Sequence, residues 1–196
     1  MALDLRIWRV SSLVKALFRY RNLLAGVPVI YALFSMRWEF ESEWLDWSLA
    51  VALCLAGIIV RGWASEHSYS RRARERRLAH TGPYALIRNP MYVGNLLVIA
   101  GLTTASELVW VLPIALAWGW AVYSLVCAAY EEPRLLRWYG GEYARYRAAV
   151  PAWIPSSAGV RGSFQVPWRL VMSETPKLLL LLPFVLKELG WPGLGR

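Results

Sequence analysis

The sequence has few of the residues that bind metals or form disulfides. Its two cysteines, Cys54 and Cys127, lie alone in apolar runs without a CxxC spacing, and its two histidines are His67 and His80. This scarcity argues against a disulfide framework and against a zinc site, so we predict no metal. The GxGxxG and Walker patterns are also absent, which argues against a Rossmann or P-loop nucleotide site.

Charged residues are scarce as well, and most of them are basic. They make up 18% of the 196 residues, against 57% hydrophobic residues, yet the net charge is +9. A nucleic-acid binder would carry its basic residues around a modest core, whereas here they separate long apolar runs. We therefore predict an integral membrane protein that contacts anionic lipid headgroups and no nucleic acid. The 12 Trp and 10 Tyr agree, because such rings collect at the headgroup level of a bilayer.

Five apolar runs predict an all-α membrane bundle of four to five transmembrane helices. A span needs about 20 apolar residues, or fewer when the helix packs among others. The last run contains a proline and is followed by charges, so it is either a short kinked span or an interfacial segment. The runs are Leu23–Met36, Trp47–Val60, Met91–Ala105, Leu108–Tyr130 and Leu178–Leu186.

The chain is expected to form one membrane domain over residues 1–196. Residues 1–22 have apolar residues at helical spacing among basic ones, which predicts an interfacial helix. Basic residues interrupt this segment, so we interpret it as uncleaved rather than as a signal peptide. Residues 61–155 are predicted to be the cofactor-binding catalytic core, with short cytoplasmic helices, and residues 156–196 a tail that holds the fifth run.

The distribution of basic residues predicts the orientation. Most of the 22 Lys and Arg residues lie in 1–22, 61–88 and 131–177, which share one face of the membrane if four spans are real. The positive-inside rule makes that face cytoplasmic. Because the long polar segments lie there too, we expect the active site on the cytoplasmic side.

The first chemical motif is HTGPYALIRNPMYVGN, residues 80–95. Its Asn89-Pro90 pair combines a favoured N-cap with a proline at the first helical position, which predicts a helix start. The unpaired N–H groups of that helix, beside Arg88, would attract a carboxylate or phosphate. The alternative is that the pair only begins a span and that Arg88 is one more positive-inside residue.

The second motif is YEEPRLLRWYGGEYARYRAAVPAWIP, residues 130–155. Glu131 and Glu132 stand where the long fourth run ends, and carboxylates at a membrane boundary are costly unless a cation or hydrogen-bond donor meets them. Arg88 is predicted to lie on the same face. The alternative is that both glutamates are solvated and stabilise the start of the following helix.

Helices are also predicted after the glutamate pair. Pro133 begins one that ends at a Gly-Gly pair, and Glu142–Ala149 forms another that carries Tyr143 and Tyr146 on one side. Together, the two motifs suit a charged cofactor with hydroxyl groups. A glutamate can accept from ribose hydroxyls, an arginine can hold a carboxylate, and aromatic faces can lie over adenine or near a sulfonium. S-adenosylmethionine has all of these groups.

The two motifs, in this order and spacing, resemble the isoprenylcysteine carboxyl methyltransferase and phospholipid methyltransferase superfamily of integral membrane enzymes. The resemblance runs from about Arg61 to Pro155. It implies a small all-helical protein that binds S-adenosylmethionine at the cytoplasmic side, while a lipidic substrate enters from the bilayer. The implied activity is methyl transfer to an isoprenylcysteine-type carboxylate or a phospholipid amine.

The resemblance also assigns residues. It implies catalytic roles for Arg88 and Glu132 and a weaker substrate role for Tyr143 and Tyr146. Carboxyl methyltransferases usually have His where this chain has Asn89, whereas YEEP is closer to phosphatidylethanolamine N-methyltransferases, so the acceptor stays open between a carboxylate, a lipid amine and a small thiol. The implied cofactor-binding residues are Tyr84, Arg88, Asn89, Tyr92, Glu131 and Glu132.

Two alternatives remain at this point. One is a sterol-type membrane reductase that uses NADPH, whose extra phosphate needs basic partners; the other is a non-enzymatic membrane scaffold. The arginines available for that phosphate are more simply explained by anionic lipid. They are Arg71, Arg72, Arg74, Arg76 and Arg77.

Overall fold

The computed structural model describes residues 12–35, 43–74, 77–108, 110–155 and 168–189. All regular elements in these ranges are helices. In chain order they are α1 (Ser12–Ala25), α2 (Val27–Phe34), α3 (Glu43–Arg74), α4 (Pro83–Leu86), α5 (Pro90–Thr104), α6 (Val111–Val126), the π-helical turn η1 (Cys127–Glu131), α7 (Glu132–Tyr139), α8 (Gly141–Ala149), α9 (Trp168–Glu174), the 3-10 helix η3 (Thr175–Leu181) and α10 (Leu182–Glu188).

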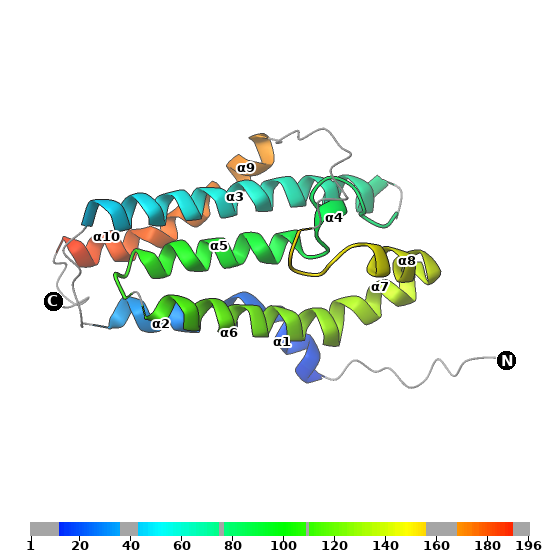
Figure 1. The fold of residues 1–196 in the computed structure, drawn as a ribbon, viewed down its shortest axis with the longest axis horizontal. Helices are drawn as coiled ribbons and strands as arrows, with labels where there is room; N and C mark the ends of the chain where they lie inside the picture. The colour runs from blue at the N-terminus through cyan, green and yellow to red at the C-terminus, as the bar shows by residue number, and fades with distance from the viewer. Residues whose placement is uncertain (1–11, 36–42, 75–76, 109, 156–167, 190–196) are drawn as a thin grey trace.

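Three long helices form the centre of the molecule. Helix α5 packs against both α3 and α6, and the three run lengthwise beside one another (Figure 1). Helices α1 and α2 pack on α6, and α9 packs on α3. The short helices α4, α7 and α8 gather at one end (Figure 1). The core between these helices includes Ile58, Val98, Leu102, Tyr123 and Val126.

The backbones of α3 and α5 approach closely at Gly94. A Cβ atom there would lie 2.8 Å from the carbonyl oxygen of Gly57 and 2.6 Å from Cγ of Arg61. Small residues allow such contact between apolar helices, where packing rather than water exclusion holds helices together. Glycine at this position therefore brings the side chain of Arg61 against α5.

Among the described residues, two helices are long and apolar enough to cross a membrane, fewer than the four to five expected. They are Trp44–Ser68, with 25 residues, and Val111–Tyr139, with 29 residues. The third run forms α5, which has only 15 residues. The first run is divided between α1 and α2, and the last between η3 and α10, in each case just before a proline. Proline cannot donate a backbone hydrogen bond, so it interrupts both helices.

Many large apolar side chains on the outside of the bundle are exposed. Monomeric soluble proteins rarely expose contiguous apolar surface on this scale. Helices α2, α3, α6 and α10 all contribute to these exposed side chains. The side chains include Ile30, Tyr31, Phe34, Leu45, Leu49, Leu55, Ile114, Trp118, Leu125, Leu182 and Val185.

The two ends of the chain are described only in part. The helix expected in residues 1–22 is represented by α1, which begins at Ser12 and continues to Ala25, beyond its predicted end. Residues 1–11 lie outside the described residues. The described part of the tail runs from α9 to α10 and includes α9 packed along α3.

Candidate active site

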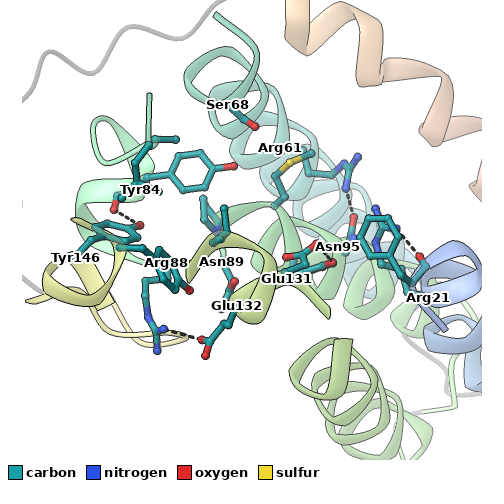
Figure 2. A pocket seen from close by; sticks show the side chains of 18 of the residues that line it. Arg21, Arg61, Ser68, Tyr84, Arg88, Asn89, Asn95, Glu131, Glu132 and Tyr146 are labelled. Carbon is teal, nitrogen blue, oxygen red and sulfur yellow. Dashed lines mark hydrogen bonds and ion pairs between the residues drawn. The ribbon is translucent and has the colours of Figure 1, made fainter. Parts of the chain in front are cut away.

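A cavity of about 220 Å³, lined by both polar and apolar side chains, opens among α1, α3, α4, α5, η1, α7 and α8. Figure 2 shows side chains from these distant segments converging on it. All the residues to which the sequence analysis gave a role line it, although their roles remain predictions. The lining consists of Phe18, Arg21, Asn22, Arg61, Ser68, Leu78, Ala79, Tyr84, Arg88, Asn89, Pro90, Met91, Tyr92, Asn95, Glu131, Glu132, Leu135, Tyr139, Tyr143 and Tyr146.

A π-helical turn places both glutamates. The backbone N–H of Glu132 donates to the carbonyl of Cys127, five residues earlier, instead of to the usual fourth. Pro133 explains this turn, because its ring would clash with the carbonyl of Ala129 in a regular α-helix. The helix predicted to begin at Pro133 and to end at the Gly-Gly pair is α7, which has Pro133 in its first turn and ends at Tyr139, just before Gly140. The wider turn η1 joins it to α6.

Glu132 forms an ion pair with Arg88 inside the cavity. Nη1 of Arg88 lies 2.7 Å from Oε1 of Glu132, and the two side chains are 14% and 19% exposed. Arg147 approaches the other carboxylate oxygen at 3.4 Å but is 55% exposed, so it contributes less. The backbone N–H of Arg88 donates to the carbonyl of Pro151. Arg88 is thus held at both its backbone and its side chain.

Glu131 has a different partner. The hydroxyl of Tyr92 donates to Oε1 of Glu131 at 2.7 Å. The ring of Tyr92 stacks on that of Tyr123 with centroids 4.5 Å apart, which fixes the hydroxyl. Among the described residues, the second oxygen of Glu131 has no protein donor. This oxygen can accept hydrogen bonds from a ligand.

Asn89 joins three segments at the start of α5. Its Nδ2 donates to the carbonyl of Ala152 at 3.2 Å, and its Oδ1 accepts from the thiol of Cys127 at 3.3 Å. The predicted helix start is confirmed, because Asn89 is the N-cap and Pro90 the first residue of α5. However, the side chain makes no capping hydrogen bond. Its carboxamide instead ties α5 to η1 and to the segment after α8.

Two tyrosines of α8 form the wall opposite α5. Tyr146 donates its hydroxyl to the carbonyl of Tyr84 at 2.8 Å, and Tyr143 is only 3% exposed. Burial raises the pKa of Tyr143, and the nearby charge of Glu132 adds to the effect. Burial likewise raises the pKa of Tyr146. Both therefore remain neutral hydroxyls at physiological pH.

The cavity also contains residues that the sequence analysis did not assign. Phe18, Arg21 and Asn22 lie at i, i+3 and i+4 on one face of α1 and reach the cavity together. Arg61 of α3 donates to Glu174 of α9 at 2.7 Å and also to Asn95 of α5. The sequence could have indicated Arg21 and Arg61 only by their place next to apolar runs. The positive-inside rule explains basic residues at such places equally well.

The structure does not describe the side chains of most of the arginines that were considered for an NADPH phosphate. Those of Arg71, Arg72, Arg74 and Arg76 are not described, and Arg77 does not line the cavity. A cavity with several charged side chains, at one end of an apolar helical bundle, is an arrangement suited to a membrane enzyme.

Residues 45–142 match the phospholipid methyltransferase family, and the chain belongs to this family. The matched segment runs from α3 into the start of α8 and includes both glutamates and Arg88. Tyr143 and Tyr146 lie just beyond it. The resemblance inferred from the two motifs is thereby confirmed, and family membership indicates a membrane methyltransferase.

Two curated relatives carry names from metal resistance. The chain is 31% identical over 156 residues to the cobalt-zinc-cadmium resistance protein CzcN of Cupriavidus metallidurans, covering 74% of this chain and 68% of that protein. It is 31% identical over 123 residues to the nickel-cobalt-cadmium resistance protein NccN of Alcaligenes xylosoxydans xylosoxydans, covering 59% of this chain and 55% of that protein. No solved structure shows significant similarity to the chain. In the described part of the chain, no group of three or more His, Cys, Asp or Glu residues is placed to hold a metal.

Proposed function

We propose that the protein transfers a methyl group from S-adenosylmethionine to a lipidic or membrane-associated acceptor at the cytoplasmic face. Family membership supports the reaction class. The observation that carries the proposal is the convergence of Arg88, Glu131 and Glu132 in one cavity at the end of an apolar bundle. This arrangement offers both a cationic and an anionic contact to a zwitterionic cofactor.

The donor would use the groups that the protein leaves unpaired. The second oxygen of Glu131 would accept from the ribose hydroxyls, and the donors of Arg88 not used by Glu132 would hold the cofactor carboxylate. Glu132 would then orient Arg88, which gives this carboxylate a positioning role. The tyrosine faces of the cavity would pack against the adenine or the sulfonium.

The chemical step is a displacement at the methyl carbon. When bound, S-adenosylmethionine would supply the methyl group and leave as a neutral thioether that keeps the electron pair of the broken carbon–sulfur bond, while a lone pair of the acceptor would form the new bond. A carboxylate acceptor needs no base, whereas an amine must lose a proton, for which Glu131 or Glu132 would be the proton acceptor. The protein's main contributions are positioning and the exclusion of water.

The proposed membrane arrangement contains more spans than the two long helices. We propose that α1 with α2, α5, and η3 with α10 complete a bundle of four or five spans, because they pack alongside α3 and α6. The cavity end would face the cytoplasm. This is supported by exposed arginines of α7 and α8 at that end, namely Arg134, Arg137, Arg145 and Arg147.

Binding calorimetry with S-adenosylhomocysteine on the detergent-solubilised full chain tests the proposal. We expect Glu131→Gln and Arg88→Ala each to weaken binding at least tenfold, because hydrogen bonds to charged groups contribute about 1.5–3 kcal/mol. The matched controls are Glu142→Gln and Arg137→Ala, which change exposed side chains outside the cavity.

The same experiment distinguishes the alternatives. Unchanged affinity in both cavity variants would refute the residue assignment. A wild-type protein that binds NADPH but not S-adenosylhomocysteine would favour the reductase, and one that binds neither would contradict a methyltransferase. A specific ligand should also raise the unfolding temperature with concentration, as mass action requires.

A further inference from the structure

Arg21 differs from the other arginines that line the cavity. Arg88 has a carboxylate partner in Glu132, and Arg61 has one in Glu174. Within the described residues, no carboxylate forms an ion pair with Arg21. The guanidinium of Arg21 on the α1 side of the cavity therefore has no direct ion-pair partner among the described residues.

The surroundings of Arg21 hold its guanidinium in place. Nη1 donates to the backbone carbonyl of Phe18, and Cζ lies 4.1 Å from the centroid of the Phe18 ring. The ring of Tyr92 lies 5.9 Å away. Nε is buried and has no hydrogen-bond partner among the described residues. A cation that is partly removed from water and keeps unused donors is poised to bind an anion.

Phe18 is itself fixed by a second ring. It stacks on Tyr130 of η1 with centroids 4.3 Å apart and an interplanar angle of 27°. The contact joins α1 to the turn that places Glu131. Arg21 is therefore held against the same structure that carries the proposed reaction centre, although α1 is more than 100 residues away in sequence.

The cavity has two sides around Glu131. Figure 2 shows Arg88, Tyr84 and Tyr146 on one side and Arg21, Arg61 and Asn95 on the other. Tyr92 connects them, because its hydroxyl holds Glu131 while its ring faces Arg21. If the methyl donor occupies the side of Arg88, an acceptor that approaches from α1 meets Arg21.

We propose that Arg21 is a specificity-determining residue that binds an oxyanion of the methyl acceptor. The inference rests on the proposed function and narrows its substrate class to amphiphiles that carry a phosphate or a carboxylate close to the methylated atom. Arg61 is less suited to this role, because Glu174 already neutralises it. Uncharged amphiphiles and small thiols without an anionic group lack the contact with Arg21.

The test measures binding of anionic and neutral amphiphiles to the full chain in a phosphate-free maltoside detergent. Lysophosphatidic acid is compared with a monoacylglycerol of the same chain, and N-acetyl-S-farnesylcysteine with its amide. Tryptophan fluorescence reports the dissociation constants. We expect the wild type to bind at least one anionic probe about tenfold or more tightly than its neutral counterpart, the size of one charge-assisted hydrogen bond.

Three variants assign that preference to Arg21. Arg21→Gln should remove the difference between the paired probes, and Arg21→Lys should retain part of it. Arg19→Gln, which changes an exposed arginine of the same helix, should behave as the wild type. The anionic probe that binds identifies the source of the oxyanion as a lipid phosphate or a carboxylate.

Parallel titration with S-adenosylhomocysteine separates this inference from the proposed function. If Arg21→Gln weakens cofactor binding but not probe discrimination, Arg21 contacts the donor and the inference is overturned. Equal binding of anionic and neutral probes by the wild type also overturns it. If the proposed function is wrong, the wild type should not bind S-adenosylhomocysteine, whether or not it distinguishes the anionic from the neutral probes.

Discussion

Glu131 and Glu132 are neighbours in the sequence, yet their carboxylates have different environments. Glu132 is paired with Arg88, whereas Glu131 accepts from Tyr92 and keeps one oxygen for a ligand. This difference suggests distinct roles, with Glu132 orienting a cation and Glu131 contacting the donor. The sequence showed that a carboxylate pair lies at the boundary, but not how the two divide these contacts.

Glu174 is another carboxylate whose ion-pair partners cannot be predicted from its position in the sequence. It lies between Arg61 and Lys177 and ties α9 to the cavity wall. Burial by itself raises the pKa of Glu174, but the hydrogen bonds from Arg61 and Lys177 outweigh this effect and lower it below its ordinary value of 4.5. The ionised form therefore stabilises the folded protein.

Stability should consequently depend on pH through Glu174. Its contribution is fully present above the ordinary pKa of 4.5 and is lost as the pH falls through the lowered folded value. Thermal unfolding measured from pH 7 to about 3 should show a lower unfolding temperature for Glu174→Gln at pH 7 and a smaller difference from wild type in acid. Glu142→Gln should follow the wild-type curve. A difference that stays constant over this pH range would contradict the assignment.

At the scale of elements, the π turn η1 decides where the glutamates point. The π turn contains one residue more than an α-helical turn, and each residue of an α-helix turns the chain by about 100°. If α6 continued into α7 as a regular α-helix, the two glutamate side chains would therefore point about 100° away from their present direction. The proline after the glutamate pair supplies the cause of the turn, and π turns of this kind are frequent at functional sites. The geometry of this turn thus directs the two carboxylates into the cavity.

Replacing Pro133 tests this account. Pro133→Ala restores a backbone donor and removes the clash with Ala129, so the helix can return to α geometry. We expect at least a tenfold loss of affinity for S-adenosylhomocysteine without a lower unfolding temperature. Pro113→Ala, at an exposed position in the first turn of α6, should leave the affinity unchanged. Full affinity in Pro133→Ala would show that other contacts maintain the turn.

At the scale of the whole molecule, helices α7 and α8, which line the cavity, and the N-terminal end of α3 lie at opposite ends of the bundle (Figure 1). An apolar surface lies between these ends, and exposed arginines surround the cavity end. A bilayer would cover the apolar part and leave both ends accessible to water. The proposed orientation places the cavity in the cytoplasm.

Single-cysteine labelling checks that orientation. The two native cysteines are buried, so an introduced cysteine on either end can be followed by its reaction with an impermeant maleimide. In bacterial cells expressing the full chain, Trp44→Cys, which replaces an 85% exposed residue, should react from outside. Ala148→Cys on α8 should react only after the membrane is opened. The reverse pattern would contradict the proposed sidedness, and labelling of both from one side would contradict a membrane-crossing α3.

The sequence by itself determined the all-helical class, the family and the residue types of the site, because apolar runs, basic segments and the two motifs are local properties of the chain. It overestimated the number of long apolar helices, because the third run forms a helix of only 15 residues and prolines divide the first and last runs. Only the tertiary structure decided that Arg88 meets Glu132, that Arg61 meets Glu174, and that α1 brings Arg21 to the cavity. These contacts join segments far apart in the chain, and they depend on how closely whole helices pack, which no local pattern specifies.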